Sequence, residues 1–88
     1  MLFRSPENQS YLDTYGWILY MMGRYRDAEA PILKAIELGS KSPVIHEHLG
    51  DIYARLGELD KAQEAWRKAL ELAPDNASLK EKVARGRL

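Results

Sequence analysis

The apolar residues of this chain recur every three to four positions, which is the spacing of one face of an α-helix. Four of them follow the series i, i+4, i+7, i+11: Tyr11, Tyr15, Ile18 and Met22. The same series returns 34 residues later as Ile45, Leu49, Ile52 and Leu56. Breaks at Gly23 and Gly57 follow these two helices, and a second amphipathic helix comes after each break. The pattern predicts two antiparallel helix hairpins.

The two hairpins are copies of one another at an offset of 34 residues. Identical residues at this offset include the pairs Gly16 and Gly50, Gly23 and Gly57, Ala28 and Ala62, and Ala35 and Ala69. A fixed period of this length is typical of stacked units that cannot bury their apolar faces alone. We therefore expect an all-α fold of two stacked helix-turn-helix repeats, which is a fragment of an α-solenoid.

Turn residues divide the chain further. The expected parts are a remnant of a preceding repeat at residues 1–8, a first repeat at 9–42, a second repeat at 43–76 and a C-terminal capping helix at 77–88. Pro43 can open a helix because its missing N–H costs nothing at the first position. The mostly charged capping helix is expected to run from Ala77 to Arg87 and to turn Leu79 and Val83 inward. The remnant indicates that the chain is the C-terminal part of a longer protein.

At these positions the chain resembles the tetratricopeptide repeat family, whose unit is 34 residues of helix, turn and helix. The second repeat carries the signature residues of the family at their spacings: Leu49, Gly50, Tyr53, Gly57, Ala62, Trp66, Ala69 and Pro74. The first repeat departs from the signature at Tyr15, Leu19 and Ser40. The resemblance implies a right-handed superhelix whose first helices line a concave groove that binds a peptide or partner protein. Residues 11–17 and 48–51 are also similar to the last repeats of bacterial members, which implies a parent protein of the bacterial cytoplasm or the periplasm and envelope.

One stripe of each first helix is left over after packing and would face that groove. It consists of Asp13, Trp17, Tyr20 and Met21 in the first repeat and of Glu47, Asp51 and Arg55 in the second. We interpret these residues as a partner-binding surface, because aromatic residues and methionine are enriched at interfaces. Two alternatives stay open. The apolar side chains can instead pack on a preceding repeat or on the last helix, and Asp51 can pair with Arg55 on a solvated ridge.

The acidic residues of this surface indicate the chemistry of the partner. Members of the family that clamp a C-terminal carboxylate resemble one another in placing lysine, asparagine and arginine on the groove. The corresponding positions here are Asp13, Trp17, Glu47 and Asp51, which would repel a carboxylate. The expected partner is therefore a protein or peptide with a basic or apolar segment.

The outer stripe of the first helix suggests a different function. An exposed apolar face of this size favours association between copies. The stripe consists of Tyr11, Tyr15, Ile18 and Met22. The alternative function is thus a self-association module that assembles the parent protein into homodimers or larger oligomers.

Composition and charge exclude several other classes. The chain has 88 residues, 13 basic and 13 acidic side chains and no cysteine. Disulfides and thiolate zinc sites are therefore impossible, and the balanced charge argues against a nucleic-acid binder, which usually carries a basic excess. The longest apolar run, residues 17–22, is far shorter than the roughly 20 residues that span a membrane. We expect neither a nucleic-acid partner nor membrane insertion.

The charge is unevenly distributed along the chain. Residues 43–76 carry four basic and seven acidic groups, whereas residues 77–88 carry four basic groups and one acidic group. We expect the last helix to pack on the second repeat and neutralise it. The alternative is a basic tail that touches nucleic acid or an anionic membrane.

The segment His46-Glu47-His48 is a candidate metal site. On a helix, residues two apart point about 200° away from each other, whereas metal-binding helices place two histidines four apart. We interpret His46 as a partly buried structural residue, because it replaces Leu12 on a packing stripe. The chain has no phosphate-binding glycine loop and no cysteine nucleophile, and its carboxylates are spread over helix surfaces. We expect no enzyme activity, no cofactor and no metal site.

Overall fold

The computed structural model describes residues 9–39 and 41–88, and every regular element in these residues is an α-helix. The helices are α1 (Gln9–Met21), α2 (Tyr25–Glu37), α3 (Pro43–Arg55), α4 (Leu59–Leu72) and α5 (Ala77–Arg85). The prediction of an all-α helical-repeat fold is confirmed. The predicted remnant at residues 1–8 lies outside the described residues, and the repeat boundaries stay a prediction.

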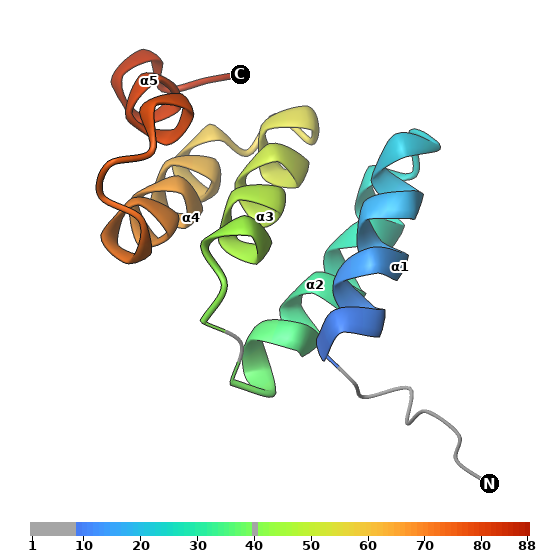
Figure 1. Cartoon of the computed structure of the whole chain (residues 1–88). Helices are drawn as coiled ribbons and strands as arrows, with labels where there is room; N and C mark the ends of the chain where they lie inside the picture. Colours follow the sequence, from blue (N-terminus) through green and yellow to red (C-terminus); the bar gives the residue numbers. More distant parts are fainter. Residues whose placement is uncertain (1–8, 40) are drawn as a thin grey trace, which may run out of the picture.

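The helices form two pairs that stand side by side, with α5 beyond the second pair (Figure 1). α1 packs against α2 and α3 packs against α4, while contacts of α2 with α3 join the pairs. α1 and α3 approach each other much less closely. The space between α1 and α3, the first helix of each pair, must therefore be filled by long side chains.

In each pair a glycine of the first helix lies directly against a side chain of the second helix. A Cβ atom on Gly16 would lie 2.7 Å from the side chain of Ile32. A Cβ atom on Gly50 would overlap the indole of Trp66, which is fully buried. The core around these contacts consists of Leu12, Leu19, Ala28, Ile32, Ala35, Ile45, Leu49, Ile52, Tyr53, Ala62, Ala65, Trp66, Ala69 and Leu79. The two glycines thus set how closely the paired backbones approach.

The turns inside the two pairs also follow the 34-residue period. Gly23 and Gly57 have φ angles of 80° and 81°. The next amide closes each turn by the same hydrogen bond, from Arg24 to the carbonyl of Leu19 and from Glu58 to that of Tyr53, both 2.9 Å long. The second pair therefore repeats the first in its backbone as well as in its sequence.

The last helix is shorter than predicted. It ends at Arg85 rather than Arg87, because Gly86 takes a left-handed φ of 74°, a conformation that is common for glycine at helix ends. Leu79 is fully buried and Val83 is partly buried, so the predicted inward face is confirmed.

We expect Gly50→Ala to lower the free energy of unfolding by up to about 2 kcal/mol. Overpacking a core costs about 1–3 kcal/mol, and the better helix propensity of alanine returns about 1 kcal/mol. Trp66 cannot swing aside easily, because its indole N–H is also hydrogen-bonded.

Gly16→Ala is the matched control for this substitution. Its new methyl group would lie 2.7 Å from two atoms of the buried Ile32 side chain and 3.3 Å from the Ala28 carbonyl oxygen, which is less overlap than with the rigid indole of Trp66, so we expect a smaller loss of stability than for Gly50→Ala. Urea unfolding measures both variants. Equal losses of stability would contradict the difference between the two contacts.

The burial of His46 predicts a pH dependence of stability. Burial lowers the pKa of this imidazole below its ordinary value, and the charge of Lys68 lowers it further. The unfolded chain therefore takes up this proton before the folded chain does, and stability decreases as the pH falls below about 6.5.

We expect His46→Leu, which copies Leu12 of the first pair, to lose less stability than the wild-type chain between neutral pH and about pH 5. Urea unfolding at both pH values measures the loss for each protein. The same loss in the variant would show that His46 does not cause it.

Candidate functional site

Three bridges cross the spaces between successive first helices, with α5 in the place of a third one. The bridges are Asp13 Oδ1 to His48 Nδ1 at 2.9 Å, Arg55 Nε donating to the Tyr20 hydroxyl at 3.2 Å, and Lys82 Nζ donating to a Glu47 carboxylate oxygen at 2.8 Å. The two residues of each bridge are 35 positions apart. An offset of 34 aligns equivalent residues, whereas an offset of 35 aligns residues that touch.

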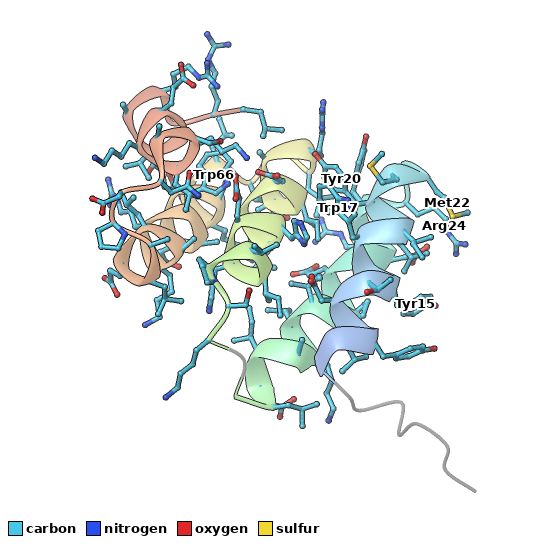
Figure 2. All side chains as sticks on the ribbon, in the orientation of Figure 1. Tyr15, Trp17, Tyr20, Met22, Arg24 and Trp66 are labelled. Atoms are coloured by element: carbon cyan, nitrogen blue, oxygen red, sulfur yellow. The ribbon has the colours of Figure 1, made fainter. Side chains whose placement is uncertain are left out.

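An aromatic stack fills the space between α1 and α3. The Trp17 indole stacks on the His48 imidazole, with ring centroids 3.9 Å apart, and on the Tyr20 ring at 4.5 Å. Tyr20 also meets the edge of Tyr25 at 5.3 Å. Figure 2 shows Trp17 and Tyr20 on the side of α1 that faces α3. These two aromatic residues thus pack on α3 and not on the last helix.

An ion cluster fills the space between α3 and α5 instead. Lys82 Nζ lies 2.8 Å from Glu47 and 2.9 Å from Asp51, and its side chain is only 15% exposed. Asp51 also accepts a hydrogen bond of 3.0 Å from the indole N–H of Trp66. Burial alone would lower the pKa of Lys82, but its two carboxylate partners outweigh burial and raise that pKa above the ordinary value. The positively charged last helix therefore does pack on the acidic second pair, as its charge predicts.

The predicted partner-binding residues differ widely in accessibility. Asp51 is 7% exposed, and both of its hydrogen-bond partners are internal, so a bound protein cannot reach its carboxylate directly. Among the described residues Asp51 does not pair with Arg55, which turns to Tyr20 instead. Asp13, Trp17, Tyr20 and Glu47 are half-buried, whereas Met21 and Arg55 are exposed. The sequence prediction did not include His48 and Lys82, although each follows an acidic residue by 35 positions.

The outer stripe of α1 is exposed to solvent. It consists of Tyr11, Tyr15, Ile18 and Met22. Figure 2 shows Tyr15 and Met22 on the side of α1 away from α3. The equivalent residues Ile45, Leu49 and Ile52 of α3 are buried, and α2 packs against that helix. The same stripe is therefore a helix-packing face in the second pair and an open face in the first.

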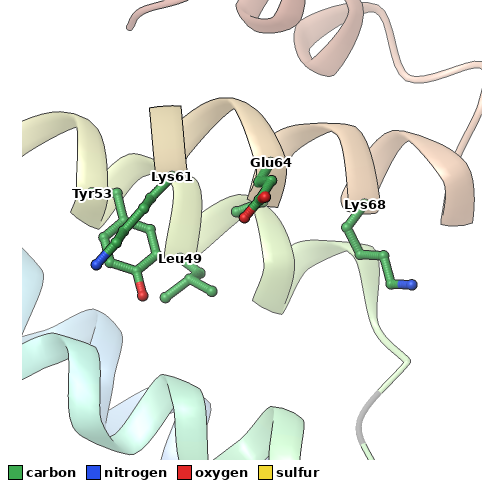
Figure 3. Close-up of a pocket in the computed structure, with 6 residues that line it drawn as sticks. Leu49, Tyr53, Lys61, Glu64 and Lys68 are labelled. Carbon is green, nitrogen blue, oxygen red and sulfur yellow. The ribbon is translucent and has the colours of Figure 1, made fainter. Parts of the chain in front are cut away.

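A hollow of about 430 Å³ opens between α3 and α4 (Figure 3). Its lining consists of Leu49, Tyr53, Lys61, Glu64, Ala65 and Lys68. Burial and a hydrogen bond with Glu29 raise the pKa of Tyr53 to about 12, so this phenol stays neutral. Lys61 lies 5.5 Å from the centroid of the same ring and 3.6 Å from Glu58. The lining offers packing and charge but no activated nucleophile.

The described part of the chain contains neither a metal-binding cluster nor a membrane-spanning helix. Within residues 9–39 and 41–88, no three side chains of histidine, aspartate or glutamate come together as a metal ion would need. His46 is buried in the core, while His48 stacks on Trp17. None of the described helices has the length and apolar character to cross a bilayer.

Comparisons with known proteins agree with this architecture. Residues 43–76 match the family model of the tetratricopeptide repeat. A TPR repeat-containing protein of Pseudomonas aeruginosa is 35% identical over 77 residues, which are 86% of this chain and 13% of that protein. Anaphase-promoting complex subunit 3 of Dictyostelium discoideum is 34% identical over 82 residues, which are 89% of this chain and 8% of that protein. This chain therefore spans only a small part of either relative. Residues 43–76 are a tetratricopeptide repeat, and the chain has the helical-repeat fold of that family.

Proposed function

We propose that this chain is a non-catalytic protein-interaction module that holds a segment of a partner on its α1–α3 face, at Trp17, Tyr20, Met21 and Arg55. The exposure of Met21 carries the proposal, because at 69% it exceeds that of every other large hydrophobic residue described. Met21 directly follows Tyr20, whose hydroxyl is held by Arg55. Tetratricopeptide repeats generally mediate contacts between proteins, and one relative is by its name a subunit of a complex.

An apolar partner segment fits this face better than a basic one. The acidic residues Asp13 and Glu47 are already bonded to His48 and Lys82. A basic segment would have to displace these internal partners, whereas an apolar segment gains about 25 cal/mol for each Å² of apolar surface that it buries. Asp51 does not contact the partner segment in this proposal. Its role is to hold Lys82 beside Glu47.

No catalytic role is part of this proposal. The carboxylates of Glu47 and Asp51 share Lys82 in an ion cluster. General acid–base catalysis needs a group whose proton can reach a substrate, and Asp51 is enclosed. Family membership agrees, since tetratricopeptide repeats typically act as scaffolds.

We expect Met21→Glu to weaken the binding of partner segments at least about tenfold, because it places a charge where apolar surface becomes buried. Peptides selected by display on the immobilised chain supply the partner. Fluorescence anisotropy then measures the dissociation constant of each peptide for both proteins.

Leu59→Glu is the matched control for Met21→Glu, because Leu59 is an exposed apolar residue of α4. It should leave the affinities unchanged. Selection of basic rather than apolar peptides would favour the alternative partner chemistry. Equal affinities for the wild-type chain and Met21→Glu would exclude this face as the binding site.

We infer self-association as a second candidate function, and the outer stripe of α1 is the observation that favours it. The one charged residue of α1 is Asp13, which turns to His48 on the opposite side. The helix α1 therefore brings no charge of its own to the stripe, and Arg24 next to Met22 is paired with Asp27. The equivalent stripe of α3 packs against the helix α2. The outer stripe of α1 has its apolar residues at the same spacing, so it is suited to pack against a helix of a second copy.

We expect the chain to form a dimer whose mass returns to that of a monomer on dilution, and Ile18→Glu to abolish the dimer. Light scattering coupled to size-exclusion chromatography, at a series of concentrations, measures the mass. Val44→Glu is the control, because Val44 of α3 is 49% exposed and Ile18 is 52% exposed. A wild-type chain that stays monomeric at high concentration would exclude this function.

A further inference from the structure

The C-terminal helix α5 is short, and three kinds of contact attach it to α3 and α4: a buried leucine, a hydrogen bond and an ion cluster. It has nine residues, fewer than an isolated helix needs for stability in water. Leu79 inserts fully into the core, and Gln63 of α4 donates a hydrogen bond of 2.8 Å to the carbonyl of Val83. Lys82 connects α5 to α3. The helix therefore depends on its docking surface for its own structure.

The surface beneath α5 requires a cation. Glu47 and Asp51 supply two negative charges to Lys82, and the Asp51 side chain is only 10% exposed. The Lys82 ammonium also lies 6.0 Å from the centroid of the Trp66 ring. A buried carboxylate without its cation is strongly unfavourable. Any helix that replaced α5 on this surface would have to bring a positive charge to the same place.

The repeat register shows what kind of element this surface accepts. Lys82 lies 34 residues after His48, and Glu47 lies 34 residues after Asp13. α5 thus meets the second helix pair as α3 meets the first pair, through the same 35-residue bridge. The surface formed by α3 and α4 is therefore suited to the first helix of another helix pair.

We propose that α5 is a removable cap. It occupies, within its own chain, a helix-binding surface that is formed by Glu47 and Asp51 of α3 and by α4 with Trp66. The partner in trans is an amphipathic helix of another protein that carries a lysine or arginine at the register of Lys82. It also carries apolar residues at the registers of Leu79 and Val83. The cap keeps this surface closed until such a helix competes for it.

The same surface discriminates against a second copy of this chain. At the registers of Leu79, Lys82 and Val83, α1 has Tyr11, Thr14 and Tyr15. The α1 helix of another copy could fill the apolar contacts, but Thr14 brings no cation to Glu47 and Asp51. Head-to-tail stacking of the chain on itself is therefore disfavoured, and a basic helix is selected.

A competition experiment on the full chain tests this proposal. The probe is a fluorescein-labelled peptide of residues 73–88, prepared with Lys82 and with Lys82→Gln. Its binding is measured by anisotropy against the wild-type chain and against a chain with Lys82→Gln, whose cap is weakened. Lys80→Gln, an exposed lysine of the same helix, is the matched control in both peptide and chain.

We expect the lysine peptide to bind the Lys82→Gln chain at least about tenfold more tightly than the wild-type chain, because the weakened cap competes less. The Lys82→Gln peptide should bind at least about tenfold more weakly than the lysine peptide, and Lys80→Gln should change neither affinity. A peptide of residues 9–22, which carries Thr14, should bind as weakly as the Lys82→Gln peptide.

Equal binding of the lysine and glutamine peptides, or no binding of either, would overturn the proposal. If circular dichroism shows that the Lys82→Gln chain is unfolded, the ratio of the two peptide affinities for the wild-type chain decides instead. The variants lie on α5, so their failure would leave the proposed role of Met21 and the α1–α3 face unaffected.

Discussion

The rest of the structure depends on the close approach of the two helices in each pair. Because residue 50 has no Cβ, the indole of Trp66 can lie directly against the backbone of α3. From there its N–H reaches Asp51, and Asp51 together with Glu47 holds Lys82. The missing methyl group on residue 50 of α3 thus helps to position the last helix, together with the buried Leu79 and the hydrogen bond from Gln63 to the Val83 carbonyl.

The two junctions between first helices use one geometry with different chemistry. Between α1 and α3 the bridge is an acid and an imidazole backed by stacked rings, and between α3 and α5 it is an ammonium shared by two carboxylates. Stacking tolerates many partners, because it depends mainly on buried area and ring orientation. An enclosed carboxylate pair tolerates only a cation. The second junction is therefore the more selective one, although the two backbones are arranged alike.

The sequence predicts the helices well, because apolar spacing and glycine breaks act locally and are repeated. It predicts the contact surface less well, because a helical stripe shows that residues share a face but not whether the next helix covers that face. Asp51 illustrates the difficulty. Its neighbour Arg55, one turn away, is the obvious partner in sequence, yet Trp66 and Lys82 bind it. The offset of 35 residues pairs Asp13 with His48 and Glu47 with Lys82, but it gives neither partner of Asp51.

The two ends of the described structure differ in how strongly they would select between partners, because one surface is apolar and the other is charged. At the α1 end the exposed stripe is apolar and the helix has a single charged residue, which faces away. Burial of such a surface is favourable for many partners, since the hydrophobic effect is non-directional. At the α5 end a wrong partner leaves Glu47 and Asp51 without a cation, and that cost applies however well its apolar residues fit. If both proposals hold, a partner is selected at the α5 end, where a charge must be matched, and much less at the apolar α1 end.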